Sequence, residues 1–220
     1  MNVFKILYYI LIFYIIIIFI IFIKKQTIHQ IKCNQIYNQK EIYTKQYILY
    51  NFLSNDECNK IINESENYSK KYGWTKDRHD EYPTTDNEIT SKWNCYQYLF
   101  KKINQDLFPI YNKFYNINSL KLKISELFVA KYDGNQEKSQ KSLDAHEDGS
   151  EFSFIIALNN DYSGGGTRFI KDNKVVKLKK GDIVIFCGQT RHEGLKVTSG
   201  VRYILTGFLK YGKCFQQFNK

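Results

Sequence analysis

The 220-residue sequence predicts an α+β domain with a sandwich or jelly-roll β core, two flanking N-terminal helices and a single preceding transmembrane helix. Seven short runs rich in β-branched and aromatic residues follow residue 121, separated by Gly, Asn and Asp turns. Two segments with apolar residues at helical spacing come before these runs. Several short strands with few helices are typical of a sandwich or jelly roll.

The N-terminal segment contains an uninterrupted apolar run over residues 6–23, flanked by Lys5 and Lys24. A helix of this length nearly spans a bilayer core, since each residue rises by about 1.5 Å. The sequence after the run offers no small-residue cleavage site. We therefore expect residues 1–25 to form an uncleaved transmembrane anchor and the polar residues 26–46 to form a stalk.

Two signals in the sequence disagree about the orientation of this anchor. Slightly more lysines follow the apolar run than precede it, which favours a cytosolic body. Asn63-Glu-Ser65 and Asn67-Tyr-Ser69 are glycosylation acceptor patterns, which are used only in the lumen. Our expectation is an endoplasmic reticulum membrane protein with a luminal catalytic domain, with the orientation left open.

The folded body is expected over residues 47–212, followed by a short tail at residues 213–220. Residues 47–53 read as a first strand. Ser54 and Glu57 have the spacing of a capping box at the start of a helix that ends near Gly73.

Residues 73–90 are polar and irregular, which is typical of a loop near a site or of plain surface. A second helix is predicted over residues 91–106, and Pro109 is expected to end or kink it. Seven strands are predicted after it, over residues 122–132, 152–158, 167–170, 174–178, 182–187, 192–197 and 201–210.

The net charge of +10 is spread along the whole chain and forms no compact basic run. We interpret it as a solvated lysine-rich surface and expect no nucleic-acid partner. The five cysteines have no CxxC spacing and no histidine pairing, which argues against a structural zinc site.

Three side chains of the β-rich half could bind a metal ion. His146 and Asp148 are two residues apart, so on an extended segment both side chains leave the same face. His192 follows 44 residues later, which is enough chain for intervening strands to bring it back across a barrel. Two imidazoles and one carboxylate can cover one face of an Fe(II) ion and leave the opposite face open.

Arg202 adds a second candidate binding residue, ten residues after His192. It shares a face with apolar residues of a predicted central strand, where an arginine is costly unless it meets an anion. One use is to bind the carboxylate of a ligand. The alternative is a structural ion pair with Glu126 or Glu193, and the residues alone leave both open.

Most of residues 47–210 resembles the Fe(II)/2-oxoglutarate-dependent dioxygenases of the prolyl and lysyl hydroxylase type. Ser54-Asn-Asp-Glu-Cys58 resembles the opening helix of that family. The other matching motifs are His146-Glu-Asp148-Gly-Ser150, Ile156-Ala-Leu-Asn159, Tyr162-Ser-Gly-Gly-Gly-Thr-Arg-Phe169, Lys180-Gly-Asp182, His192-Glu-Gly194 and Gly200-Val-Arg-Tyr-Ile204.

The resemblance implies a double-stranded β-helix in which His146, Asp148 and His192 hold Fe(II). It also implies that Arg202 binds the distal carboxylate of 2-oxoglutarate, with Tyr132 and Thr167 as supporting contacts. The expected reaction is hydroxylation of a prolyl or lysyl side chain in a protein, with release of succinate and CO2 and with ascorbate as reductant.

Arg202 and the Gly-Gly-Gly turn are more similar to lysyl hydroxylases, because collagen-type prolyl hydroxylases usually carry lysine at the position of Arg202. The alternative function, from another class, is a metal-organised jelly-roll module that binds a glycan or peptide without catalysis. A third is an anchor protein whose basic body meets anionic lipid or nucleic acid. The sequence does not predict the oligomeric state.

Overall fold

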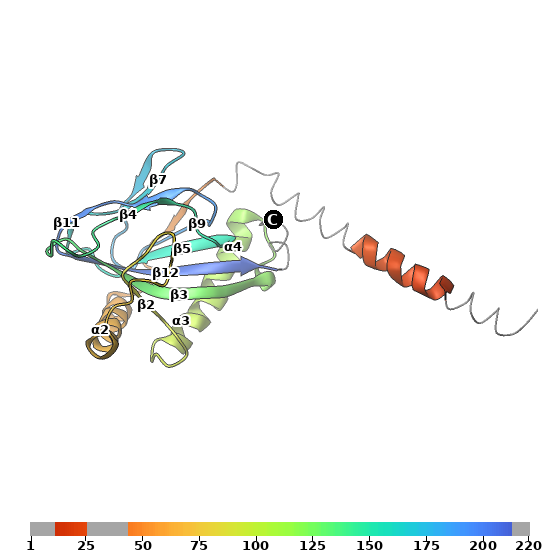
Figure 1. Cartoon of the computed structure of the whole chain (residues 1–220), viewed down its shortest axis with the longest axis horizontal. Helices are drawn as coiled ribbons and strands as arrows, with labels where there is room; N and C mark the ends of the chain where they lie inside the picture. Colours follow the sequence, from red (N-terminus) through yellow and green to blue (C-terminus); the bar gives the residue numbers. More distant parts are fainter. Residues whose placement is uncertain (1–11, 26–43, 213–220) are drawn as a thin grey trace, which may run out of the picture. The chain divides into compact units, whose positions relative to one another are not determined.

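The computed structural model describes residues 12–25 and 44–212 (Figure 1). Residues 12–25 are helical and belong to a separate unit from residues 44–212. The predicted stalk up to residue 43 and the predicted tail at residues 213–220 lie outside the described residues. Within the two described ranges, no helix has both the length and the apolar character needed to cross a membrane. The predicted transmembrane helix is therefore not supported there, and its residues 1–11 lie outside the description.

The larger of the sheets in residues 44–212 contains six strands, and every neighbouring pair is antiparallel. In spatial order the strands are β1 (Tyr47–Leu49), β9 (Ile183–Cys187), β5 (Phe152–Ala157), β12 (Val201–Tyr211), β3 (Leu122–Asp133) and β2 (Asp86–Glu88). β12 and β3 form the long central strand pair of the sheet. Arg202 on β12 lies directly opposite Tyr132 on β3.

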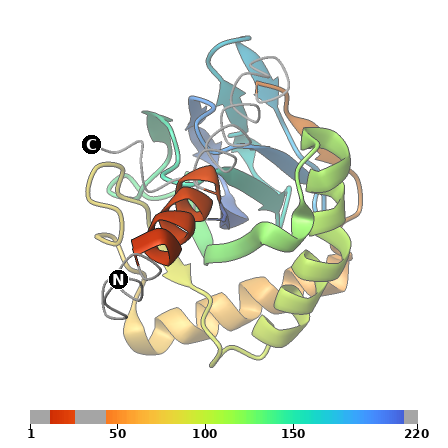
Figure 2. The same ribbon diagram turned by 90° about the vertical axis from the view of Figure 1, so that its right-hand side faces the viewer.

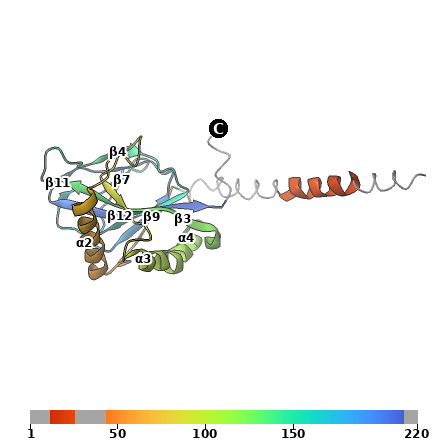
Figure 3. The same ribbon diagram turned by 60° about the horizontal axis from the view of Figure 1, so that its bottom comes forward.

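A smaller antiparallel sheet faces the large one (Figure 3). Its order is β4 (Leu143–His146), β10 (His192–Gly194), β7 (Thr167–Phe169) and β8 (Lys174–Val176). A separate two-stranded ladder joins β11 (Val197–Ser199) to β6 (Ser163–Gly164).

Apolar side chains from both sheets form the core between them. Alternate residues of the large sheet point inward, as the period of two along a strand requires. Phe128 and Ala130 of β3 and Val184 and Phe186 of β9 are buried there with Phe169 of the small sheet. Two antiparallel sheets around one core agree with the predicted jelly roll.

Helices cover the other face of the large sheet (Figure 2). They are α2 (Asn55–Tyr72), α3 (Tyr96–Lys102), a π-helix (Ile103–Leu107) and α4 (Phe108–Tyr115), before a 3-10 turn (Ser119–Lys121). The Tyr111 hydroxyl of α4 donates a 2.7 Å hydrogen bond to the Ser153 carbonyl in β5. The predicted capping box of Ser54 and Glu57 is present, and Gly73 ends α2 as predicted.

The second predicted helix differs from the prediction at both ends. It begins at Tyr96, and the helical segment runs through Pro109 to Tyr115. Pro109 does not end it, because the residue lies in the first turn of α4, where its missing N–H is tolerated. The π-helix just before it is closed by a bond from the Phe108 N–H to the Ile103 carbonyl.

Several strand predictions also need correction. The first strand is shorter than residues 47–53, and the predicted strand over residues 192–197 is two strands, β10 and β11. The short strands β2, β4 and β6 were not predicted, since each lies in a stretch where apolar periodicity gives no signal.

Candidate metal centre

His146, Asp148 and His192 meet at one end of the small sheet. His146 is the last residue of β4, and His192 is the first residue of β10. The two are direct cross-strand partners. Oδ1 of Asp148 lies 3.4 Å from Nε2 of His146 and 3.8 Å from Nε2 of His192. One ligand atom from each of the three lies within 4.8 Å of the others, and all three residues are buried.

Backbone carbonyls fix the orientation of both imidazoles. Nδ1 of His146 donates to the Asp144 carbonyl at 2.7 Å, and Nδ1 of His192 donates to the Thr190 carbonyl at 2.8 Å. A carbonyl can only accept, so each Nδ1 carries a proton and each Nε2 is the nitrogen that faces the cluster and can coordinate a metal. Outer partners of this kind are what orient metal-binding histidines.

Asp148 is held by its backbone, while its carboxylate stays available. Its N–H donates to the Gly188 carbonyl at 2.8 Å. A Cβ at Gly188 would lie 2.2 Å from the Ser150 carbonyl oxygen, so this close approach requires glycine. Oδ2 of Asp148 is buried and has no hydrogen-bond partner. An orphaned buried carboxylate oxygen is expensive unless it meets a cation.

The electrostatics of the cluster favour an ionised Asp148 and a neutral His192, two of the three protonation states that a metal ion requires. Burial raises the pKa of the Asp148 carboxyl, but His192 and His146 outweigh burial and hold it below its usual range. Burial lowers the pKa of His192. Burial also lowers the pKa of His146, but its hydrogen bond with Asp148 outweighs this and raises it. Two imidazoles and one carboxylate fit a divalent metal of the Fe(II) type, which on binding would displace the proton from His146.

Arg202 lies in the same pocket and is 4% exposed. Its Nη1 donates to the Gly166 carbonyl at 3.3 Å and its Nη2 donates to Thr167 Oγ1 at 3.4 Å. Its Nε is buried without a partner. Within residues 12–25 and 44–212, no carboxylate forms an ion pair with this guanidinium.

The structural ion pair considered for Arg202 is wrong, because both candidate carboxylates have other partners. Glu126 lies 3.3 Å from Nη2 of Arg78, and Glu193 lies 2.7 Å from Nη2 of Arg168. A buried arginine without a counterion costs free energy unless a ligand supplies the anion. The pocket therefore has room and charge for a carboxylate ligand beside the metal cluster.

Tyr132 and Thr167 both lie at Arg202. The Arg202 guanidinium carbon lies 5.5 Å from the centre of the Tyr132 ring, and Tyr132 is its cross-strand neighbour. Burial raises the pKa of the Tyr132 phenol, so it is a hydrogen-bond donor at neutral pH. The structure therefore brings all six predicted site residues into one pocket of about 290 Å³.

One wall of this pocket comes from the segment over residues 79–84. His79, Asp80, Glu81, Tyr82 and Thr84 all line the pocket. The Tyr82 ring lies 5.1 Å from the His146 ring, centre to centre. The sequence predicted only a loop near a site or plain surface for this segment. Its run of charged and aromatic residues was the one signal in the sequence that could have indicated a pocket wall.

Comparisons with known proteins identify relatives of this site. No family model matches the chain. It is 34% identical over 140 residues to procollagen-lysine,2-oxoglutarate 5-dioxygenase 1 of Rattus norvegicus, covering 60% of this chain and 18% of the relative. It is 42% identical over 89 residues to a multifunctional procollagen lysine hydroxylase and glycosyltransferase of Caenorhabditis elegans, covering 38% of this chain and 12% of the relative.

Over these aligned segments the chain is similar in sequence to 2-oxoglutarate-dependent procollagen lysine hydroxylases. It spans less than a fifth of the length of these curated relatives, as the 18% coverage shows. Their similarity confirms the resemblance noted in the sequence motifs.

Solved structures agree on the fold. A prolyl hydroxylase from Trichoplax adhaerens, in complex with a hypoxia inducible factor peptide, has a TM-score of 0.62 at 16% identity, covering 89% of this chain and 96% of that one. The viral collagen prolyl hydroxylase of Paramecium Bursaria Chlorella virus-1, with 2-oxoglutarate, has a TM-score of 0.57 at 22% identity, covering 74% and 94%. At these identities the likeness concerns the fold alone.

Proposed function

We propose that this chain is an Fe(II)- and 2-oxoglutarate-dependent dioxygenase that hydroxylates a C–H bond of a peptidyl side chain. The observation that carries the proposal is the buried Arg202, without a carboxylate partner in the described residues, in the same pocket as His146, Asp148 and His192. A module that only binds a glycan or peptide needs neither an open metal face nor a buried guanidinium aimed at a small anion.

Each site residue has a role in this proposal. His146, Asp148 and His192 would hold Fe(II), with the Nδ1 hydrogen bonds to backbone carbonyls keeping both imidazoles in the ligating tautomer. Arg202 would bind the distal carboxylate of 2-oxoglutarate. Thr167 holds the Arg202 guanidinium in place, and Tyr132 would donate its phenolic hydrogen to the same cosubstrate.

Bound Fe(II) would activate O2 as the oxidant, with two electrons from 2-oxoglutarate and two from the C–H bond; one oxygen atom would enter succinate, the other the hydroxylated side chain, and CO2 would leave. The chain itself contributes position and exclusion of water. Its apolar pocket walls, including Phe128, Ile155 and Ile204, surround the cosubstrate position and keep bulk water away from the reacting C–H bond.

Lysine is the side chain that we favour as substrate. The curated relatives quoted above are named for procollagen lysine. The chain as a whole has a net charge of +10. The pocket is nevertheless lined by three exposed acidic residues, Asp80, Glu81 and Glu147. Exposed carboxylates at the pocket suit an incoming ammonium group. Proline is the alternative, in line with the solved prolyl hydroxylase structures.

The experiment that tests this function is succinate release from the chain with Fe(II), 2-oxoglutarate and a panel of lysine- and proline-containing peptides. We expect succinate release to rise with a lysine peptide and that peptide to gain one oxygen atom. Parallel reactions with and without ascorbate test its proposed role as reductant. Peptide binding without succinate release from any member would favour the binding module instead.

Further proposals concern the domain division and the location of the chain. We propose an anchor at residues 1–25, a stalk at residues 26–46, a catalytic domain over residues 47–212 and a tail at residues 213–220. We also propose a luminal placement in the endoplasmic reticulum. Asn63 and Asn67 are exposed on α2, so glycosylation at either side chain is compatible with the fold. A mobility shift removed by glycosidase, and lost in Asn63→Gln with Asn67→Gln, would establish the luminal side; its absence in the parent would contradict it.

A further inference from the structure

The segment over residues 79–84 forms a wall of the catalytic pocket but contains no strand or helix. We infer that Arg78 and Gln140 are positioning residues that clamp the two ends of this segment and so shape the site where the peptide substrate binds. The inference rests on the proposed function. Neither residue touches the metal cluster or Arg202, so both would act through the segment that they hold.

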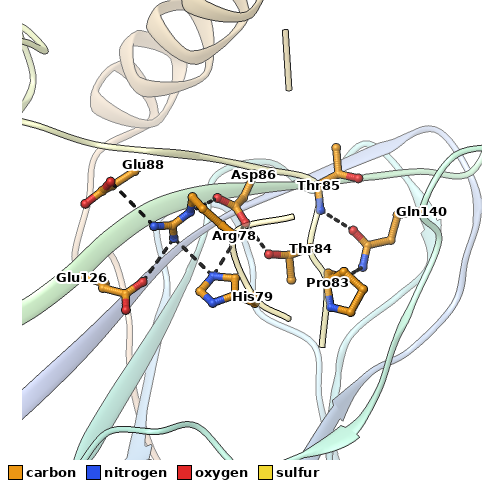
Figure 4. A network of polar contacts seen from close by, with 9 residues as sticks. All are labelled: Arg78, His79, Pro83, Thr84, Thr85, Asp86, Glu88, Glu126 and Gln140. Atoms are coloured by element: carbon orange, nitrogen blue, oxygen red, sulfur yellow. Dashed lines mark hydrogen bonds and ion pairs between the residues drawn. The ribbon is translucent and has the colours of Figure 1, made fainter. Parts of the chain in front are cut away.

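Arg78 anchors the first end (Figure 4). Its Nε lies 2.6 Å from Oδ1 of Asp86, a residue of β2 that is fully buried. Its Nη2 lies 3.3 Å from a Glu126 carboxylate oxygen on β3, and its Nη1 lies 3.7 Å from Glu88. The guanidinium also lies over the Phe128 ring, 5.0 Å from its centre.

These contacts make the Arg78 cluster more than a surface ion pair. One guanidinium meets carboxylates on two neighbouring strands, and a planar fork of donors is suited to such a junction. Asp86 also accepts a hydrogen bond from the Thr84 hydroxyl, so the same carboxylate holds both ends of the segment. Removing Arg78 would leave a buried carboxylate without its cation.

Gln140 anchors the second end from a different loop. Its side-chain oxygen accepts a hydrogen bond from the Thr85 N–H at 2.5 Å, and its side-chain nitrogen donates to the Pro83 carbonyl at 3.0 Å (Figure 4). Its backbone carbonyl accepts from the Asp133 N–H at 2.9 Å. One amide therefore ties the segment to the chain that leaves β3.

Between the two clamps, ring contacts place the wall against the metal cluster. The His79 ring lies 5.2 Å from the Phe128 ring and 6.1 Å from the Phe208 ring. The Tyr82 ring lies 5.1 Å from the ring of His146. A side chain that enters the pocket toward the metal would pass this wall, so small shifts of residues 79–84 would change its fit.

The clamp should affect binding of the peptide and not binding of 2-oxoglutarate. Arg202 is held by Gly166 and Thr167, which belong to the turn before β7 and to β7 itself. Neither Arg78 nor Gln140 contacts these residues. Loosening the wall is therefore expected to weaken peptide binding and leave the cosubstrate site unchanged.

The test compares Arg78→Met and Gln140→Ala with the parent and with Lys131→Met as matched control. Lys131 forms an ion pair with Glu66 at 2.7 Å, and its side chain is 20% exposed, as is that of Arg78. It therefore forms a comparable ion pair, between β3 and α2, that does not line the pocket. Two readouts are used: hydrogen exchange of the amides over residues 79–86, and the KM values for 2-oxoglutarate and for the most active peptide of the panel.

We expect faster amide exchange over residues 79–86 and a peptide KM raised about tenfold in both clamp variants, with little change in the KM for 2-oxoglutarate. Arg78→Lys should recover part of the peptide affinity, since it restores the charge but not the fork. The Lys131→Met control should show neither change.

The inference would be overturned by unchanged exchange over residues 79–86, or by faster exchange with an unchanged peptide KM. An equal rise of peptide KM in Lys131→Met would also overturn it, since the effect would then be general destabilisation. A parent chain that releases no succinate with any peptide would instead overturn the proposed function, and the exchange measurement would still decide whether the clamp exists.

Discussion

His146 lies directly opposite His192 in the antiparallel ladder between β4 and β10, with the two ring centres 4.4 Å apart. This register brings together two histidines that lie 46 positions apart in the chain. A slip of one residue would turn one imidazole to the other face of the sheet. The metal cluster is thus a consequence of strand register, and Asp148 completes it two residues after β4 ends.

Metal binding should stabilise the chain, and Asp148→Ala should remove that effect. Anaerobic Fe(II) at about 100 times its Kd would stabilise the parent by about 2.7 kcal/mol, which is roughly 5–10 °C in Tm. The variant loses the only carboxylate of the cluster. Thermal unfolding with and without Fe(II) measures the difference.

The matched control for this measurement is Glu147→Gln, which removes an exposed carboxylate next in sequence and outside the metal cluster. It should keep the full shift in Tm with Fe(II). A full shift in Asp148→Ala would mean that the metal binds elsewhere.

Arg202→Met should raise the KM for 2-oxoglutarate by about 10–100-fold, since each hydrogen bond to a charged group contributes about 1.5–3 kcal/mol. The KM of Arg202→Lys for 2-oxoglutarate should lie between those of the parent and Arg202→Met, because lysine keeps the charge without the bidentate fork. Steady-state kinetics at varied 2-oxoglutarate measure both. Because no carboxylate of the described residues pairs with Arg202, Arg202→Met should not lower the Tm of the metal-free chain much. A large loss of Tm with an unchanged KM would assign Arg202 a structural role.

The buried Glu151 carboxyl, which is not a metal ligand, should make the free energy of unfolding depend on pH. Both of its carboxylate oxygens are buried without a hydrogen-bond partner, and burial raises its pKa above the ordinary 4.5. The folded state therefore favours the protonated form. The stability that this group contributes is present below pH 4.5 and is lost as the pH rises through the higher folded pKa.

Glu151→Gln should therefore raise the Tm at pH 7 and change it little near pH 4. Thermal unfolding of both proteins at the two pH values measures the effect. An equal Tm for parent and variant at pH 7 would contradict the assignment of an uncompensated buried carboxylate.

Much of the site could be predicted from the sequence because its residues sit in patterns that local chemistry dictates. Two ligands spaced by two on an extended segment must share a face, and an arginine within an apolar strand must meet an anion. The capping box of Ser54 and Glu57 is likewise a local signal, and α2 begins after Ser54 and ends at Gly73 as predicted.

The parts that were not predicted depend on contacts between distant residues. β2 exists because Asp86 pairs with Ala130 of β3 and accepts Arg78 and Thr84, none of which is a local pattern. The pocket wall at residues 79–84 has the same origin. The ion-pair partners of Glu126 and Glu193 could not be predicted from the sequence either, because it contains several arginines and only the fold selects among them.

The most direct test of the central claim is Fe(II)-dependent conversion of 2-oxoglutarate to succinate by the full chain, measured side by side for the parent, Asp148→Ala and Asp144→Asn. The site predicts succinate from the parent and from Asp144→Asn, which removes an exposed carboxylate of β4 outside the pocket lining, and none above background from Asp148→Ala. No Fe(II)-dependent succinate from the parent, or an equal rate in Asp148→Ala, would contradict it.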